Sequence, residues 1–294
     1  MKIEFLATLA AVADHGSLAA AAERVNLTPS AVSLQMKQLE AYFGEAIVDR
    51  SGRSVRLTRY GRELAQVGLR AFDDLEAMRR VSGARPAGKV RLGIAASALT
   101  SLLPESFAQL RQQAPGVVLD VQRGASDQLL SDVKAGRLDA AVIIRPPSGG
   151  SSRFCWTPLM DEEYVLVVPE DLPGNDARKL LRQLPWIRLD RSLLTGRIAA
   201  RFVDSLLPQH PALLDLPASD VIVAMVESGV GVSVLPRLRA RIRDSHRIRE
   251  VRLGRGGPVR QTAFVQRTSD SEKRTINAVK AAFVEVAARL GRDD

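Results

Sequence analysis

Residues 17–57 read SLAAAAERVNLTPSAVSLQMKQLEAYFGEAIVDRSGRSVRL, and this stretch predicts a helix-turn-helix followed by a basic loop. A short alanine-rich helix covers residues 19–25, and a tight connection leads to a second helix that reaches about Tyr42. Thr28 suits the N-cap of this second helix because its hydroxyl can accept a backbone N–H. Pro29 suits the first helical position because the N–H that proline lacks has no partner there.

The second helix has one apolar face, whose residues recur at helical spacing and are expected to point inward: Val32, Met36, Leu39 and Phe43. The outward residues of its first turns are Ser30, Ser33, Leu34 and Lys37. A helix presented in this way can enter a DNA major groove, although an ordinary helical hairpin inside a larger core is the alternative for the pattern alone. Closely following arginines favour a wing that contacts phosphates: Arg50, Arg53, Arg56, Arg59 and Arg62.

Length and composition indicate a globular protein with more than one domain. The chain has 294 residues, of which 46% are hydrophobic and 26% charged. It contains no apolar run of the ~18 residues that a membrane span needs. Because Glu4 and Asp14 interrupt the N-terminal region, it does not resemble a signal peptide either. We therefore expect a cytoplasmic protein without a membrane partner.

The residues typical of metal sites, disulfides and catalysis are scarce. Cys155 is the single cysteine, so neither an internal disulfide nor a cysteine-rich metal site can form. Its apolar surroundings favour a buried structural thiol over a redox sensor. The three histidines have no metal-ligand spacing, and no nucleophile elbow, P-loop or dinucleotide fingerprint occurs. The sequence predicts no enzyme activity, no metal and no cofactor.

The net charge of +9 favours a polyanionic partner but is distributed unevenly. Residues 1–62 carry eight Lys or Arg residues and six acidic ones, which leaves only +2. Residues 237–260 carry nine arginines and two acidic residues, which leaves +7. This arginine-rich stretch can be a solvated face, an assembly surface or an extra nucleic-acid contact, and the sequence does not decide between them.

A long helix is expected from Thr58 to about Val81. Within it, residues repeat at the spacing of a short coiled-coil seam: Leu64, Gly68, Ala71, Leu75 and Met78. This repeat predicts pairing with the same helix of a second chain. The alternative is an amphipathic helix that lies on its own domain.

From Lys89 onward the pattern changes to alternating strands and helices. Strands are expected at residues 90–94, 117–122, 140–144, 164–169, 232–235 and 262–266. Helices are expected at residues 102–113, 127–135, 178–184, 197–207, 219–228 and 271–290. Such alternation favours parallel βαβ units.

The chain resembles a LysR-type transcriptional regulator over its whole length. The most specific motifs occur in family order in the N-terminal third: Gly16-Ser17, Ala21-Ala22, Thr28-Pro29-Ser30-Ala31-Val32-Ser33, Leu39-Glu40, Gly44, Asp49-Arg50, and Leu57-Thr58 with Gly61. Residues 226–236 (VESGVGVSVLP) resemble the family's glycine-rich turn that ends in Leu-Pro. The departures are apolar swaps at Leu9 and at Ile47-Val48, and Leu34 at a position that is often basic or polar in the family.

The resemblance implies an α/β protein with three parts. These are an N-terminal winged helix-turn-helix (residues 1–58), a linker helix and hinge (59–87), and an effector-binding regulatory domain (88–294). The last is similar to type 2 periplasmic binding proteins and has two subdomains: I (88–162 and 267–294) and II (163–266). The chain is expected to cross between them near Asp161–Tyr164 and Gln266–Thr268, and closure of the cleft would move the DNA-reading heads.

The resemblance also implies the DNA contacts. Base reading is expected from Pro29, Ser30, Ser33 and Leu34 at the start of the recognition helix, which Thr28 caps. Phosphate contacts are expected from Ser17, Lys37, Arg50, Arg53 and Arg56. Two copies would read a pseudo-palindromic operator in double-stranded DNA, with affinity that falls as salt rises.

A small-molecule effector is expected in the cleft between the two subdomains, where strand ends and helix N-termini meet. Ser97 and Thr100 match effector contacts of the family by position, and Arg145 follows a strand and can pair with a carboxylate. Thr195 and Val221 would line the opposite wall. For single residues, plain helix caps or a surface charge are equally good interpretations. The best prediction for the ligand is an anionic small molecule.

The expected partners are therefore operator DNA, a small-molecule effector and further copies of the chain, as a homodimer or homotetramer. RNA polymerase is a further partner that the resemblance allows. Two alternatives stay open: an architectural DNA-binding protein that ignores small molecules, and a small-molecule-binding protein that no longer regulates DNA. Salt-dependent operator binding would distinguish the last of these from a regulator.

Overall fold

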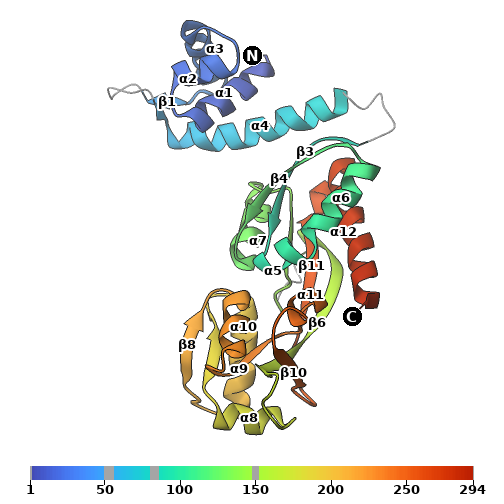
Figure 1. The fold of residues 1–294 in the computed structure, drawn as a ribbon. Helices are drawn as coiled ribbons and strands as arrows, with labels where there is room; N and C mark the ends of the chain where they lie inside the picture. Colours follow the sequence, from blue (N-terminus) through green and yellow to red (C-terminus); the bar gives the residue numbers. More distant parts are fainter. Residues whose placement is uncertain (1, 50–55, 80–85, 148–151, 294) are drawn as a thin grey trace. The chain divides into compact units, whose positions relative to one another are not determined.

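The computed structural model of the protein describes residues 2–49, 56–79, 86–147 and 152–293. The chain divides into two compact units, Met1–Lys89 and Val90–Asp294. Each unit has its own core of buried apolar side chains. Most of the helices and strands of both units are labelled in Figure 1.

The N-terminal unit contains the predicted helix-turn-helix. Its elements are α1 (Glu4–His15), α2 (Leu18–Arg24), α3 (Pro29–Phe43), the antiparallel strands β1 (Val48–Asp49) and β2 (Arg56–Leu57), and α4 (Arg59–Arg79). The Thr28 hydroxyl accepts a hydrogen bond from the Ala31 N–H at 3.2 Å, and Pro29 opens α3. Val32, Met36 and Leu39 are fully buried, which confirms the predicted inward face of the second helix.

Helix α4 packs one face against its own unit. Gly61, Ala65 and Gly68 are buried, and a Cβ atom at Gly68 would lie 2.9 Å from Leu6 Cδ2 of α1. The expectation that Gly68 belongs to a free seam is therefore wrong, because the missing side chain lets α4 approach α1 closely. Leu64 is half-buried against the same core, whereas Ala71 and Leu75 are exposed. The Met78 side chain lies outside the described part of the structure.

The C-terminal unit is built on a mixed seven-stranded sheet in the order β10-β6-β11-β5-β3-β4, with β9 also paired to β6. Its strands are β3 (Ala87–Ile94), β4 (Gly116–Arg123), β5 (Ala140–Ile144), β6 (Phe154–Pro169), β9 (Ser233–Pro236), β10 (Ile248–Arg252) and β11 (Val259–Arg267). Strands β3 and β5 are parallel, but β6 runs antiparallel to β9, β10 and β11. The expected parallel pairing is present between β3 and β5 and between β7 (Trp186–Leu189) and β8 (Ala212–Leu216), whereas the sequence did not predict the antiparallel pairing of β6.

Subdomain I contains the β4-β3-β5-β11 part of the sheet. One face is covered by α5 (Ala96–Ser101), α6 (Leu103–Gln113) and α12 (Arg274–Asp293), and the other by α7 (Ser126–Ala135). A short 3-10 turn, Thr268–Asp270, joins β11 to α12.

Subdomain II surrounds the second half of β6 with β9, β10 and a separate parallel pair, β7 (Trp186–Leu189) and β8 (Ala212–Leu216). Its helices are α8 (Ala177–Gln183), α9 (Leu194–Leu206), α10 (Ser219–Glu227) and α11 (Ala240–Arg243). Residues of α8 and α9 pack in one core cluster, and residues of α10 pack in another. Strands β7, β8 and β10 were not expected from the sequence.

The chain crosses between the subdomains on β6 and at the start of β11. The first part of β6 pairs with β11, and from Tyr164 onward β6 pairs with β9 and β10. The Tyr164 N–H donates to the carbonyl of Pro258, just before β11. Because the rest of β11 pairs with β5 of subdomain I, the second crossing lies near Pro258, not at Gln266–Thr268 as expected.

Candidate DNA-reading surface and effector cleft

The first turns of α3 present an exposed face opposite the buried one. Ser30 and Lys37 are exposed, Ser33 is half-buried, and Leu34 keeps 57% of its surface exposed. Thr28 and Pro29 are exposed beside them, and the Thr28 and Ser30 hydroxyls lie 3.0 Å apart. This face offers small hydroxyls, one apolar side chain and one cation, all within reach of a partner surface.

Helix α2 and the wing frame this face. The Ser17 hydroxyl accepts from the Ala20 N–H at 3.2 Å and caps α2. The Glu40 carboxylate of α3 accepts from the backbone N–H groups of Ile47 and Val48, at 3.0 and 2.9 Å, and so fixes the first wing strand to the recognition helix. Arg56 is exposed on β2. The predicted phosphate contacts Arg50 and Arg53 lie outside the described residues.

The predicted effector residues of subdomain I lie at the carboxyl ends of two parallel neighbours, β3 and β5. Ser97 is half-buried and Thr100 exposed in α5, directly after β3. The Thr100 hydroxyl bonds back to the Ser97 carbonyl at 3.4 Å, as in a plain helical turn. Ser126, which no sequence motif indicated, accepts a hydrogen bond from the Ile144 N–H at 3.2 Å through its Oγ and brings the first turn of α7 to the end of β5.

Arg145 has no carboxylate partner among the described residues. Its Nη1 donates to the side-chain oxygen of Gln261 at 3.1 Å, and its guanidinium lies 5.4 Å from the centre of the Trp156 ring. The nearby carboxylate of Asp161 accepts from Gln261 Nε2 at 2.9 Å, so Gln261 lies between Asp161 and Arg145. Both of these contacts of the half-buried arginine, the amide oxygen and the aromatic face, are with neutral groups.

Thr195 and Val221 stand at the starts of α9 and α10, which follow the parallel strands β7 and β8 and therefore begin at the same end of subdomain II. Neither helix is capped by a side chain, so their first N–H groups are available to an acceptor. Val221 is 47% exposed. Thr195 is half-buried because its hydroxyl accepts from Arg260 Nη1 at 3.0 Å.

The contact to Thr195 belongs to a hydrogen-bonded network on the crossing strands. Arg260 pairs with Glu162, and the Tyr164 hydroxyl donates to the Thr195 carbonyl at 3.0 Å. Burial, the largest effect, raises the pKa of the Tyr164 hydroxyl, so it remains a neutral donor. The network fixes the start of α9 to the point where the chain passes between the subdomains.

The arginine-rich stretch 237–260 bonds mainly within its own subdomain, which none of the three interpretations of the sequence included. Arg237 lies 3.6 Å from Glu163 and 3.9 Å from Glu250. Further side chains of the stretch pair in the same way: Arg247 with Glu170 and Asp171, and Arg249 with Asn175 and the carbonyls of Leu172 and Gly174. Arg260 instead pairs with Glu162 where the chain crosses between the subdomains. Strand β10 runs through the stretch, and its Ile248 and Val251 are buried.

Two family models match the chain, each mainly within one of its two units. The family described as bacterial regulatory helix-turn-helix protein, lysR family, matches residues 3–62, and the LysR substrate binding domain matches residues 83–288. The chain belongs to the LysR family of transcriptional regulators. It is a DNA-binding regulator with an effector-binding domain, as the sequence motifs predicted.

Individual LysR-type relatives support this conclusion along most of the chain. The probable HTH-type transcriptional regulator LrrA of Synechococcus elongatus is 29% identical over 251 residues, which cover 82% of each chain. A probable hydrogen peroxide-inducible genes activator of Mycobacterium avium is 30% identical over 241 residues, which cover 79% of this chain and 76% of the relative.

Solved structures of LysR-type proteins share the fold. A full-length OxyR variant from Pseudomonas aeruginosa is similar with a TM-score of 0.70 and 25% identity, over 96% of this chain and 94% of that one. Full-length LysG from Corynebacterium glutamicum with bound effector Arg has a TM-score of 0.64 and 19% identity, over 98% and 99% of the two chains, and shows the fold alone. The predicted fold class is thereby confirmed.

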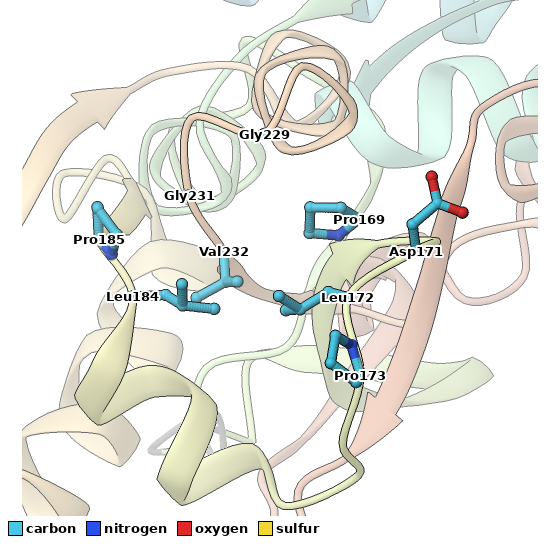
Figure 2. A pocket seen from close by; sticks show the side chains of 9 residues that line it. All are labelled: Pro169, Asp171, Leu172, Pro173, Leu184, Pro185, Gly229, Gly231 and Val232. Carbon is cyan, nitrogen blue, oxygen red and sulfur yellow. The ribbon is translucent and has the colours of Figure 1, made fainter.

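A pocket of about 320 Å³ lies elsewhere in this LysR-type regulator, where β6 ends and β7 and β9 are about to begin (Figure 2). It is lined by Pro169, Asp171, Leu172, Pro173, Leu184, Pro185, Gly229, Gly231 and Val232. None of the predicted effector residues lines it: Thr195 and Val221 follow the opposite, carboxyl ends of β7 and β8, and the other three belong to subdomain I. No helix within the described ranges combines the length and apolar character of a bilayer span.

Proposed function

We propose that this LysR-type regulator binds a pseudo-palindromic operator as an oligomer and that an anionic small molecule between subdomains I and II changes this binding or transcriptional activation. The observation that carries the ligand class is Arg145, a half-buried cation without a carboxylate partner in the described structure. The uncapped first turns of α9 and α10 add N–H donors to the opposite side of the same cleft.

The division of labour follows the predicted domains: residues 1–58 read DNA, residues 59–87 link and pair, and residues 88–294 bind the effector. In the first part, α3 enters the major groove with Pro29, Ser30, Ser33 and Leu34 against the bases. Ser17, Lys37, Arg50, Arg53 and Arg56 contact phosphates, and Thr28 holds the start of α3 in shape.

Self-association uses two surfaces. On α4, the free apolar stripe consists of Val67, Ala71 and Leu75, with Val67 67% and Leu75 47% exposed, and it replaces the seam that included Gly68. On the effector domain, the edge strands β4 and β8 expose Val118 (58%) and Leu213 (53%). Two separate apolar surfaces favour a homotetramer over a dimer.

Some relatives are named for a response to hydrogen peroxide, but this chain cannot respond by forming an internal disulfide. Such a bond needs two cysteines, and this chain has only Cys155, whose Sγ lies 3.8 Å from Thr268 Oγ1. A non-covalent effector is therefore the better proposal. We propose no enzymatic activity, and we expect the protein to act in the cytoplasm, where it can reach DNA and RNA polymerase.

The DNA proposal is tested by DNase footprinting of DNA upstream of the protein's own gene at two salt concentrations. A protected pseudo-palindrome whose protection weakens with salt supports the proposal. If no protection is seen, a selection for bound genomic fragments follows, and failure to recover any fragment would contradict the proposal. A small-molecule-binding protein without DNA regulation would show this second outcome.

The effector proposal is tested by thermal shift and calorimetry with a panel of mono- and dicarboxylates. We expect Arg145→Gln to weaken a binding carboxylate about ten- to a hundredfold, the loss typical of a hydrogen bond between charged groups. Arg182→Gln, which changes an exposed arginine of α8, is the control. If no carboxylate stabilises the wild type, or if Arg145→Gln binds one as well, the anionic effector is excluded and an architectural DNA-binding role gains support.

A further inference from the structure

Two helices from different subdomains are joined by one ion pair. Asp127 lies in the first turn of α7 in subdomain I, and Arg197 lies in the first turn of α9 in subdomain II. Arg197 Nη2 donates to Asp127 Oδ2 at 2.6 Å. Their side chains remain 32% (Arg197) and 59% (Asp127) exposed, so the pair is open to solvent.

The arginine of this pair is held in place from behind. Arg197 Nη1 donates to the Ser192 carbonyl at 2.8 Å, which fixes the guanidinium toward subdomain I. Two residues earlier, Thr195 bonds to Arg260 and Tyr164 on the crossing strands. The first turn of α9 is therefore tied to the hinge through Thr195 and to α7 through Arg197.

These two ties respond differently to a rotation of the subdomains. The Thr195 contacts involve residues on or beside the crossing strands, which form the axis of such a motion. Asp127 belongs to a helix of the other subdomain, so opening the cleft separates it from Arg197. An exposed ion pair weakens as its charges separate and is largely screened beyond about 8–10 Å at physiological salt, so it stabilises mainly the arrangement in which α7 and α9 touch.

We propose that the Asp127–Arg197 ion pair is a latch that favours this arrangement, with α7 and α9 in contact, before any effector binds. The inference rests on the proposed function only in taking the cleft as the effector site. An effector that binds there has to keep the latch or to replace Asp127 at Arg197 with its own acidic group. The latch thereby sets how far the cleft opens in the free protein.

The test measures the distance between α7 and α9 directly, without DNA or effector. Spin labels are placed at Lys134 of α7 and Arg201 of α9, two exposed positions, in the full-length chain with Cys155→Ser. Labelled protein is diluted with unlabelled protein so that one labelled protomer is present per oligomer. Pulsed electron paramagnetic resonance then gives the ratio of near to distant populations.

We expect Asp127→Asn to raise the distant population about two- to fivefold relative to the near one, the size of effect typical of an exposed ion pair. Molar salt should cause the same shift in the wild type and little change in the variant. The exchange of both charges, Asp127→Arg with Arg197→Asp, should restore part of the near population.

Glu105→Gln is the matched control, because Glu105 and Arg289 form an exposed ion pair of 2.9 Å within subdomain I. It should leave the distances unchanged. The latch is refuted if Asp127→Asn has the same distance distribution as the wild type, or if the control shifts it equally. Failure of the proposed function would appear instead in footprinting and carboxylate binding, which this measurement does not use.

Discussion

Arg260 and Glu162 form a bidentate ion pair where β11 and β6 carry the chain between the subdomains, with Nε–Oε2 and Nη2–Oε1 distances of 2.9 Å each. Their side chains are only 6% and 13% exposed. Thr262 also donates to Glu162 at 2.9 Å, so that the carboxylate is well supplied with donors. The hinge of the effector domain is thus a hydrogen-bonded cluster of largely buried polar side chains.

Removing one partner of this pair should be more harmful than removing both. Glu162→Ala leaves the Arg260 charge buried without a carboxylate, and we expect it to lower the free energy of unfolding of the effector domain by ~3–5 kcal/mol. The double variant Glu162→Leu with Arg260→Met leaves neither charge of the pair unpaired, so its free energy of unfolding should fall by less. Urea unfolding measures both, and an equal or larger loss in the double variant would contradict the argument.

The two glycines of α4 should differ in their tolerance of a side chain. A Cβ atom at Gly61 would lie 2.2 Å from the backbone oxygen of Ile47, which cannot move without displacing the wing. At Gly68 the obstacle is the flexible end of Leu6, at 2.9 Å. We expect Gly61→Ala to cost ~2–3 kcal/mol, and Gly68→Ala to be near neutral because alanine also favours the helix. Thermal unfolding of the N-terminal unit measures both, and equal losses would refute the distinction.

Acid should weaken the contact between α10 and β10. Glu227 accepts from the Arg247 N–H at 2.8 Å and lies 2.7 Å from His246 Nδ1. The Arg247 N–H and, second, His246 lower the pKa of Glu227 below its ordinary 4.5. A carboxylate whose pKa is lowered in the folded state stabilises the fold at any pH above its pKa in the unfolded state. This stabilisation is lost as the pH falls through its pKa in the folded state.

Glu227→Gln should therefore be less stable than the wild type near neutral pH and approach it as the pH falls below 4.5, the ordinary pKa of a glutamate. Urea midpoints across this range measure the difference. Parallel curves for the two proteins would show that the Glu227 carboxylate does not contribute in this way.

Local chemistry made the N-terminal unit predictable from the sequence. Thr28 and Pro29 specify the start of α3 through an N-cap and a missing N–H, and the spacing of Val32 and Met36 specifies its buried face. The same spacing in α4 did not reveal which helix covers that face. Only the structure shows that α1 lies against Gly68, because a seam between chains and a seam within one chain have the same periodicity.

The effector domain was less predictable because its decisive contacts join distant residues. Arg249 donates to the carbonyl of Leu172, and β10 within the arginine-rich stretch pairs with β6, whereas the sequence left the role of this stretch undecided. The crossing at Pro258 depends on the pairing of β11 with β5, which the alternation of strands and helices does not specify. Likewise, Asp127 and Arg197 carried no motif, and their contact follows only from the approach of two subdomains.

The exposed face of α3 predicts how operator affinity depends on salt concentration. Lys37 is the exposed cation of its first turns, and Leu34 stands where a basic residue would add a second. Each phosphate contact contributes about 0.9 to the slope of log affinity against log salt. We expect Lys37→Gln to lower this slope by about 0.9, and Leu34→Arg to raise it by a similar amount while changing the preferred operator. Lys134→Gln on α7 should change neither quantity. Binding titrations on the footprinted operator at several salt concentrations measure the slopes, and an unchanged slope in Lys37→Gln would remove this residue from the phosphate contacts.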